Sequence, residues 1–182
     1  MKKILSISIV SLAVIMLLIT VIYTLPKKYE VTIEAVSYQL GHKNSDIVKP
    51  VSIQINGKLS RNLKGYKKFK GTINIEDENI PISEGSKELD IKFQVNGEGY
   101  MIYSDIKDGQ IKMFSFGSVF ISEDCTKISI SKFTEDKDLN SSQRGWNGED
   151  GLMISGPATN RLEALEISNE LMKKSLHGYI LR

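Results

Sequence analysis

The chain has 182 residues, with 24 Lys or Arg against 22 Asp or Glu, so its formal charge is +2. Its single cysteine, Cys125, excludes an internal disulfide. Its length is sufficient for one domain with a hydrophobic core, together with a short additional segment.

An uncharged, apolar segment spans residues 4–25, and 14 of its 22 positions are Ile, Leu or Val. As a helix it would extend about 33 Å, enough to cross a hydrocarbon core of about 30 Å. We therefore predict a single-pass transmembrane anchor at the cell membrane. Lys2 and Lys3 favour a cytoplasmic amino terminus at residues 1–3, although Lys27 and Lys28 oppose this orientation.

This topology makes residues 26–28 a juxtamembrane linker and residues 29–182 an extracytoplasmic domain. A cleaved signal peptide is the alternative. The apolar run is longer than the roughly 7–15 residues of a signal-peptide core, and no small-x-small cleavage site follows it closely. We expect no nucleic-acid partner, because a domain outside the cell rarely meets one.

Apolar and polar residues alternate over most of the chain after residue 28, as is typical of half-buried strands. The Asn56-Gly57 pair indicates a two-residue hairpin turn, since both residues tolerate a positive φ. The pattern predicts a mainly β domain of about eight strands in an antiparallel meander, folded as a curled sheet, a barrel or a sandwich. The alternating segments are residues 29–36, 51–55, 58–63, 69–75, 88–95, 100–104, 110–121, 125–133 and 152–155.

Charge is unevenly distributed along these segments. Without the four lysines that flank the apolar run, 20 basic residues stand against 22 acidic ones, so the outer domain is at −2. Residues 43–70 contain eight basic residues and one acid, whereas residues 76–90 contain six acids and one base. A basic hairpin at residues 58–70 could bind an anionic wall polymer or lipid headgroups, or could simply be solvated. Its candidate residues are Lys58, Arg61, Lys64, Lys67, Lys68 and Lys70.

Residues 134–151 are polar and interrupt the strand pattern, and they include the only tryptophan, Trp146. Trp146 could stack on a sugar or anchor a partner, or it could pack beneath its own loop. Residues 136–140 have the alternating oxygen ligands of a calcium loop. The required Gly and Glu are replaced by Ser141 and Asn147, so we expect no calcium site.

Residues 157–177 predict one helix, which Ser155 or Gly156 can cap and which Gly178 can end. Two apolar stripes run along it. The first, which we expect to pack on the sheet, comprises Ala158, Leu162, Leu165, Met172 and Leu176. The second, which could face a loop, a groove or a partner, comprises Ala164, Ile167 and Leu171.

The sequence predicts no catalytic residue, cofactor site or metal site. Two isolated histidines, His42 and His177, do not make a zinc ligand set. Glu149 and Asp150 are adjacent, whereas a glycosidase needs two carboxyls on opposite sides of a cleft. Cys125 precedes an alternating run, and we expect it to be a strand residue and not a nucleophile.

Three short motifs resemble a known set of proteins. They are Phe69-Lys-Gly-Thr-Ile-Asn-Ile75, Phe116-Gly-Ser-Val-Phe-Ile-Ser-Glu-Asp124 and Gly156-Pro-Ala-Thr-Asn-Arg-Leu-Glu-Ala-Leu-Glu-Ile167. With the apolar amino terminus, they resemble small uncharacterised membrane-anchored proteins of spore-forming Gram-positive bacteria. The resemblance implies the anchor and the outward-facing domain, and it brings no activity and no functional residues.

The leading hypothesis is a membrane-anchored, non-catalytic envelope module that binds a protein partner at the outer membrane face. The anchor, the twice-striped helix and the lack of a catalytic set motivate it. The second hypothesis is binding of anionic wall polymer or lipid headgroups through the basic hairpin, and a cell-wall hydrolase is the least favoured.

Overall fold

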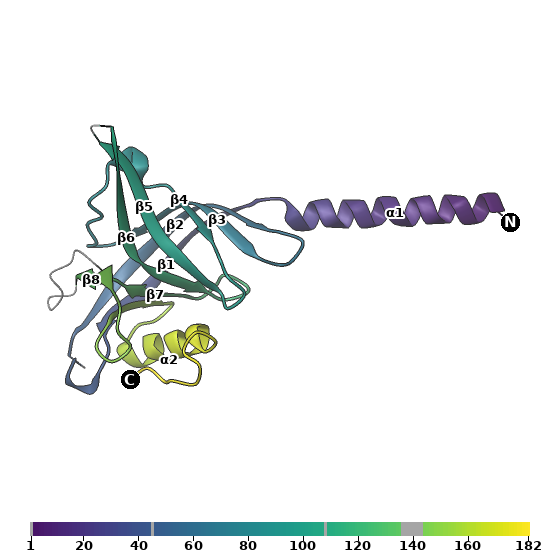
Figure 1. Ribbon diagram of the computed structural model, residues 1–182. Coiled ribbons are helices and arrows are strands. Elements are labelled where there is room, and N and C mark those ends of the chain that lie inside the picture. The colour runs from purple at the N-terminus through teal and green to yellow at the C-terminus, as the bar shows by residue number, and fades with distance from the viewer. Residues whose placement is uncertain (1, 45, 108, 136–143) are drawn as a thin grey trace.

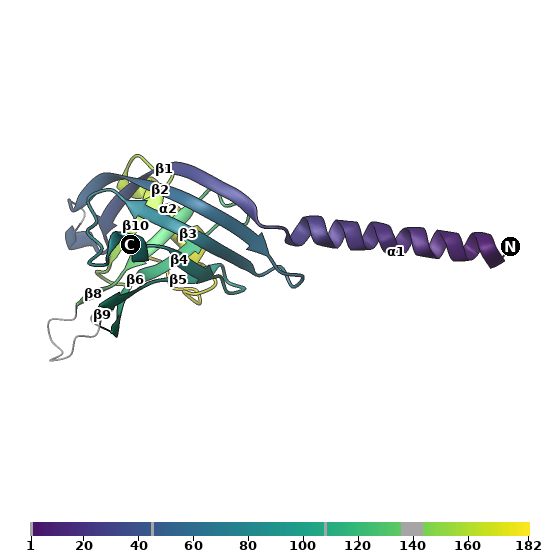
Figure 2. The same cartoon turned by 90° about the horizontal axis from the view of Figure 1, so that it is seen from above.

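The computed structural model describes residues 2–44, 46–107, 109–135 and 144–182. Helix α1 (Lys2–Thr24) leaves one end of a β domain, and helix α2 (Arg161–Met172) lies along the side of that domain (Figures 1 and 2). Over the described residues, none of the helices combines the length and the apolar character needed to cross a membrane. The anchor at residues 4–25 stays a prediction.

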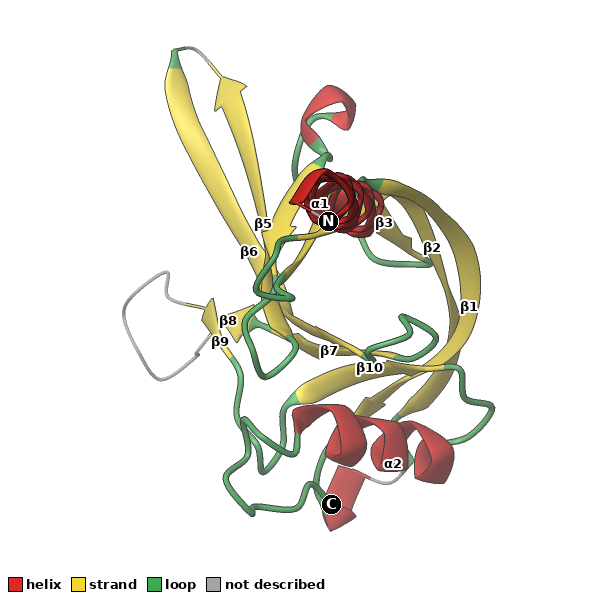
Figure 3. Cartoon of the chain, turned by 90° about the vertical axis from the view of Figure 1, so that its right-hand side faces the viewer, coloured by secondary structure: helices red, strands yellow, loops and turns green. Residues whose placement is uncertain are grey.

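The domain is an eight-stranded antiparallel sheet that nearly closes into a barrel (Figure 3). Successive strands pair with one another and the last returns to the first, while β4 and β5 share no ladder in the described chain. This confirms the mainly β fold with an antiparallel meander and a C-terminal helix. The barrel strands are β1 (Lys27–Gln39), β2 (Val48–Arg61), β3 (Lys67–Ile75), β4 (Leu89–Lys92), β5 (Glu98–Lys107), β6 (Gln110–Ile121), β7 (Ile128–Lys132) and β10 (Leu152–Gly156).

Three smaller features complete the chain. Strands β8 (Thr134–Glu135) and β9 (Arg144–Gly145) form a separate ribbon, and two short 3-10 helices, η1 (His42–Asn44) and η2 (Glu84–Ser86), lie in connections. The end of the barrel from which α1 leaves is named the near end here, and it carries the turns at residues 62–66, 93–97 and 122–127. The tip of the β5–β6 hairpin lies at the opposite, far end (Figure 1).

Alternate side chains of the strands fill the inside of the barrel. Ile53, Met101, Tyr103 and Ile130 are fully buried there, and the cavity left among the core side chains measures about 20 Å³. An eight-stranded barrel is just wide enough to be filled by side chains or to hold one small ligand. Here the core itself fills the interior, so a ligand has room to bind only at the surface.

The Asn56-Gly57 pair lies within β2 and makes no turn, so the hairpin predicted there is wrong. Gly57 instead pairs with Gly71 of β3. A Cβ atom at Gly57 would lie 2.8 Å from the Phe69 ring and 2.5 Å from the Lys70 carbonyl oxygen. The glycine therefore permits β2, β3 and the Phe69 ring to approach one another closely. A glycine within a strand often marks such a close approach.

Helix α2 starts later and ends earlier than predicted, at Arg161 and Met172 in place of residues 157 and 177. Asn160 is its N-cap, because the Asn160 side chain accepts a hydrogen bond from the Glu163 backbone N–H at 3.0 Å. The backbone N–H of Ala158 donates to a carbonyl of β1, so the chain still follows the sheet at that point. The helix forms only after the chain leaves this contact.

The face that α2 turns to the barrel is also different from the prediction. Ala164, Ile167, Ser168 and Met172 are buried, whereas Leu162 of the expected packing stripe is 66 % exposed. The stripe expected to face a loop, a groove or a partner therefore packs on the sheet as well, beside Ala158 and Met172 of the first stripe. It covers a second cluster on the outside of the sheet that includes Val36, Tyr38, Phe120 and Met153.

Four buried hydroxyls lie at the centre of this helix–sheet contact. Ser168 Oγ is 2.6 Å from Tyr38 Oη, 2.7 Å from Ser155 Oγ and 3.0 Å from Ser129 Oγ. Ser168 also donates to the Ala164 carbonyl at 3.0 Å. These hydroxyls are fully buried and hydrogen-bond to one another. Buried polar groups need such partners, because without them their burial is costly.

Candidate anion-binding site at the near end of the barrel

Strands β2 and β3 form the basic hairpin, and its turn lies at residues 62–66. Asn62 shapes this turn, because its Oδ1 accepts hydrogen bonds from the backbone N–H groups of Lys64 and Tyr66 at 3.0 and 2.9 Å. Leu63 and Lys64 at the tip are exposed. The turn therefore presents an apolar and a cationic side chain at the near end.

Three lysines form one cross-strand row on the outer face of the barrel. Lys28 of β1 is in register with Lys58 of β2, and Lys58 is in register with Lys70 of β3. Lys28 belongs to β1 and not to the predicted linker. Like charges directly opposite one another destabilise a sheet, so an anion bound over this row would relieve an existing repulsion.

The acidic segment provides partners for part of the hairpin. Strand β4 pairs with β3, which brings Asp90 to within 2.9 Å of Lys68 and Glu88 to within 3.5 Å of Lys70. Exposed pairs of this kind contribute about 0–1 kcal/mol. Lys58 makes no ion pair in the described part of the chain, and its charge remains available to an external anion.

Arg61 and Lys67, which are paired across the hairpin, face the mouth of the barrel. Arg61 Nη2 donates to the Glu123 carbonyl at 2.8 Å. Lys67 Nζ donates to the Ser122 and Glu123 carbonyls at 2.7 and 2.9 Å. Burial lowers the pKa of Lys67, and the neighbouring Arg61 charge acts in the same direction. These two cations therefore hold a loop closed over the mouth.

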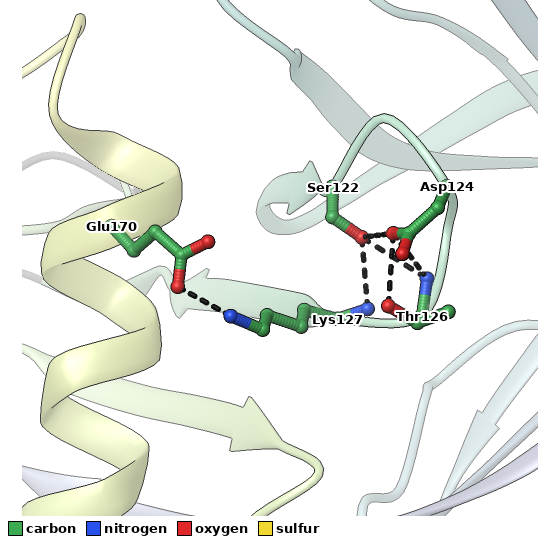
Figure 4. A network of polar contacts seen from close by, with 5 residues as sticks. All are labelled: Ser122, Asp124, Thr126, Lys127 and Glu170. Carbon is green, nitrogen blue, oxygen red and sulfur yellow. Dashed lines mark hydrogen bonds and ion pairs between the residues drawn. The ribbon is translucent and has the colours of Figure 1, made fainter.

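That loop, residues 122–127, is organised by the Asp124 carboxylate (Figure 4). Asp124 Oδ1 accepts from the Ser122 hydroxyl at 2.5 Å and from the backbone N–H and hydroxyl of Thr126 at 3.1 and 2.8 Å. These bonds lower the pKa of Asp124 to about 2. Lys127 extends from the loop to Glu170 of α2 at 2.5 Å, so the loop is also tied to the helix (Figure 4).

Cys125 lies in this loop with a φ of 61°, so the prediction that it is a strand residue is wrong. Its side chain is buried, and the Tyr29 hydroxyl donates to its carbonyl oxygen. Burial raises the pKa of the Cys125 thiol. The buried side chain and the bond from Tyr29 make Cys125 part of the closure of the mouth.

A hollow of about 810 Å³ crosses the near end, and exposed turns border it. Val95 in the β4–β5 turn is 73 % exposed and Leu63 in the β2–β3 turn is 72 % exposed. Lys64, Lys173 and Lys174 line the same hollow. None of these three lysines makes an ion pair with any residue that the structure describes. The near end thus combines apolar tips with these lysines, although Glu123, Asp124 and Glu170 also line the hollow.

Sequence reasoning found the hairpin lysines but missed Val95 and the Lys173–Lys174 pair as parts of this surface. Val95 and the two lysines lie close together because Asn96 of the β4–β5 turn donates a hydrogen bond to the Ser175 hydroxyl at 2.8 Å. Ser175 lies just after α2 in the chain. The available signal in the sequence was Val95, an apolar residue directly before the Asn96-Gly97 pair.

The other predicted candidates lie away from the near end. Trp146 is half-buried against the cluster beneath α2. Glu149 and Asp150 are exposed in a turn beside the Gly41 backbone at the far end. The calcium-like residues 136–140 lie outside the described residues. Within the described chain, no three His, Cys, Asp or Glu side chains could together hold a metal.

Comparison of the chain with protein-family models, curated proteins and solved structures finds no match. The resemblance carried by the three short motifs therefore stays a prediction.

Proposed function

We propose that the chain is a non-catalytic, single-pass membrane protein of the cell envelope whose barrel binds the anionic outer surface of the membrane through its near end. Residues 4–25 span the membrane, the amino terminus is cytoplasmic and the barrel stands outside. The observation that carries the proposal is the gathering of exposed apolar turns and unpaired lysines on the end from which α1 leaves.

The expected binding free energies suit a weak contact between the barrel and the membrane surface, in addition to the anchor. Each Lys or Arg close to an anionic lipid surface contributes roughly 1 kcal/mol, and complete burial of a Leu or Val side chain contributes about 1.5–3 kcal/mol. The binding free energy expected from the three lysines and two apolar residues is therefore enough to keep the barrel against the membrane. These residues are Lys64, Lys173, Lys174, Leu63 and Val95. Because the anchor already supplies a high local concentration, strong binding is not needed.

Quenching of tryptophan by brominated lipid tests this contact. In the full chain reconstituted into anionic vesicles, the emission added by Val95→Trp should fall when the lipid is brominated, because the turn reaches the acyl region. Ile106→Trp, an equally exposed position at the far end, is the matched control and should keep its emission. Equal emission of Val95→Trp with brominated and ordinary lipid would refute the proposal.

An anionic wall polymer offers the same phosphate chemistry to the lysines. A polymer would neutralise them without bringing Val95 to the acyl region, so it predicts no quenching by brominated lipid. The test therefore separates the two ligand classes.

The β5–β6 hairpin supports a second candidate function, binding of an envelope protein partner at the far end. Ile106 and Ile111 face each other across the hairpin, and with Met113 they are 74, 71 and 70 % exposed. Exposed apolar stripes of this kind mark interaction surfaces. The stripe predicted for this role on α2 is not available, because Ala164 and Ile167 are buried.

A photo-reactive residue placed at Ile106 tests this second function in intact cells. One discrete protein adduct is expected at Ile106 and none at the exposed position Glu30 on the barrel wall. Identical labelling from both positions would argue against a partner site on the hairpin.

A further inference from the structure

A groove of about 590 Å³ lies between the end of α1 and the mouth of the barrel. Its apolar wall comes from both elements: α1 contributes Ile19 and Ile22, the connection contributes Leu25, and β2 contributes Leu59. Ile19, Ile22 and Leu25 are exposed although they adjoin the barrel. The groove is therefore an apolar surface with room beside it.

The facing wall of the groove is cationic. Lys27, Lys28 and Arg61 line it against one carboxylate, Asp124. Asp124 Oδ1 already accepts hydrogen bonds from two hydroxyls of its own loop, and Lys28 pairs with the exposed Glu30 at 2.5 Å. Lys27 makes no ion pair over the described residues, so this wall presents a net positive charge to the groove.

Arg61 is the central residue of this wall. It lines this groove and also the two hollows next to it. One of its N–H groups donates to the Glu123 carbonyl, and a guanidinium has five. Its planar group can bind two phosphate oxygens at once, which a lysine cannot do.

We infer that this groove binds one anionic phospholipid, with the phosphate at Arg61 and Lys27 and one acyl chain against the apolar wall. The inference rests on the proposed membrane location and names the lipid class that the near end selects. A volume of about 590 Å³ falls within the roughly 300–1,000 Å³ of small-molecule sites. It accommodates a headgroup and the first part of one chain, and the rest of the lipid stays in the bilayer.

Native mass spectrometry of the full chain tests the inference. The protein is extracted into neutral detergent from vesicles with equal amounts of phosphatidylglycerol and phosphatidylcholine. One phosphatidylglycerol per chain is expected to remain bound, in clear preference to phosphatidylcholine. Arg61→Gln should lower this retention roughly ten- to a hundredfold, as expected for the loss of a charge-assisted contact.

Two variants control for charge and folding. Lys112→Gln removes one exposed charge from β6, a strand that does not line the groove, and should retain the lipid. Arg61→Lys keeps the charge and should retain more lipid than Arg61→Gln. Equal retention of both lipids by the unmodified chain, unchanged retention by a folded Arg61→Gln chain, or complete displacement by soluble glycerol phosphate would each overturn the inference.

The brominated-lipid measurement distinguishes a failure of this inference from a failure of the proposed function. If only the groove assignment is wrong, Val95→Trp is still quenched although no lipid is retained. If the barrel does not meet the membrane at all, Val95→Trp is not quenched in the otherwise unmodified chain.

Discussion

Asp124 shows how one carboxylate can close the barrel mouth. Its oxygen accepts three hydrogen bonds within residues 122–127, and those residues present the carbonyls that receive Arg61 and Lys67. Its neighbour Glu123 is exposed and contributes its backbone to the same contact. The loop is thereby a rigid cover whose position depends on a charged side chain.

The protein should lose stability in acid through Asp124. The pKa of this group falls from 3.8 to about 2 on folding, so its stabilising contribution is complete above about pH 4 and disappears as the pH falls toward 2. Melting temperatures measured between pH 5 and pH 2 should therefore fall less steeply in Asp124→Asn than in the unmodified chain. Asp150→Asn is the control and should follow the unmodified chain; an identical acid profile for Asp124→Asn would contradict the assignment.

Gly57→Ala should destabilise the barrel by about 1–3 kcal/mol, the usual cost of overpacking. The new methyl group would meet the Phe69 ring and a β3 carbonyl, and neither can move without opening the β2–β3 pairing. Urea unfolding of the full chain in one detergent measures the change. Gly85→Ala, whose added methyl group meets nothing within 4 Å, should have little effect, and equal midpoints for the two variants would disprove the close approach.

At the scale of elements, alternation in the sequence predicted the strands well but predicted less about where they turn. Val51, Ile53 and Ile55 alternate as expected and point into the barrel. Asn56-Gly57 suits a tight turn, but pairing on both sides of β2 outweighed that local preference. Strand pairing depends on residues that are distant in sequence, so a local turn signal cannot decide it.

The faces of α2 were predicted less well, for a reason that lies in Ser168. A serine between two apolar stripes reads as a surface residue, yet its hydroxyl is buried among three others. The stripe that packs on the sheet is consequently centred on a polar residue. Composition and periodicity could not indicate this, because the partners of Ser168 come from β1, β7 and β10.

Ser168→Ala should lower the free energy of unfolding by about 1–3 kcal/mol, since it leaves buried hydroxyls without a partner. Chemical denaturation with the same detergent gives the value. Ser104→Ala on the exposed face of β5 is the matched control and should change stability little. A loss at Ser168 no larger than at Ser104 would show that the hydroxyl cluster does not stabilise the contact between helix and sheet.

At the scale of the whole molecule, the two ends of the barrel differ in chemistry. Residues 29–182 carry a slight negative charge, yet apolar turns and lysines without an ion pair in the described chain meet at the near end. The basic hairpin was predictable because its lysines are close in sequence. The complete surface was not, because barrel closure brings together residues 62–66, 93–97 and 173–174, which no local pattern connects.

This difference between the ends supports the proposal that the near end lies against an anionic membrane. The decisive measurement is hydrogen exchange of the full chain, compared between nanodiscs with and without anionic lipid. Slower exchange is expected in the turns at residues 62–66 and 93–97 when anionic lipid is present, and unchanged exchange in the far-end hairpin at Ile106 and Ile111. Equal exchange at the near end in both kinds of nanodisc would contradict it.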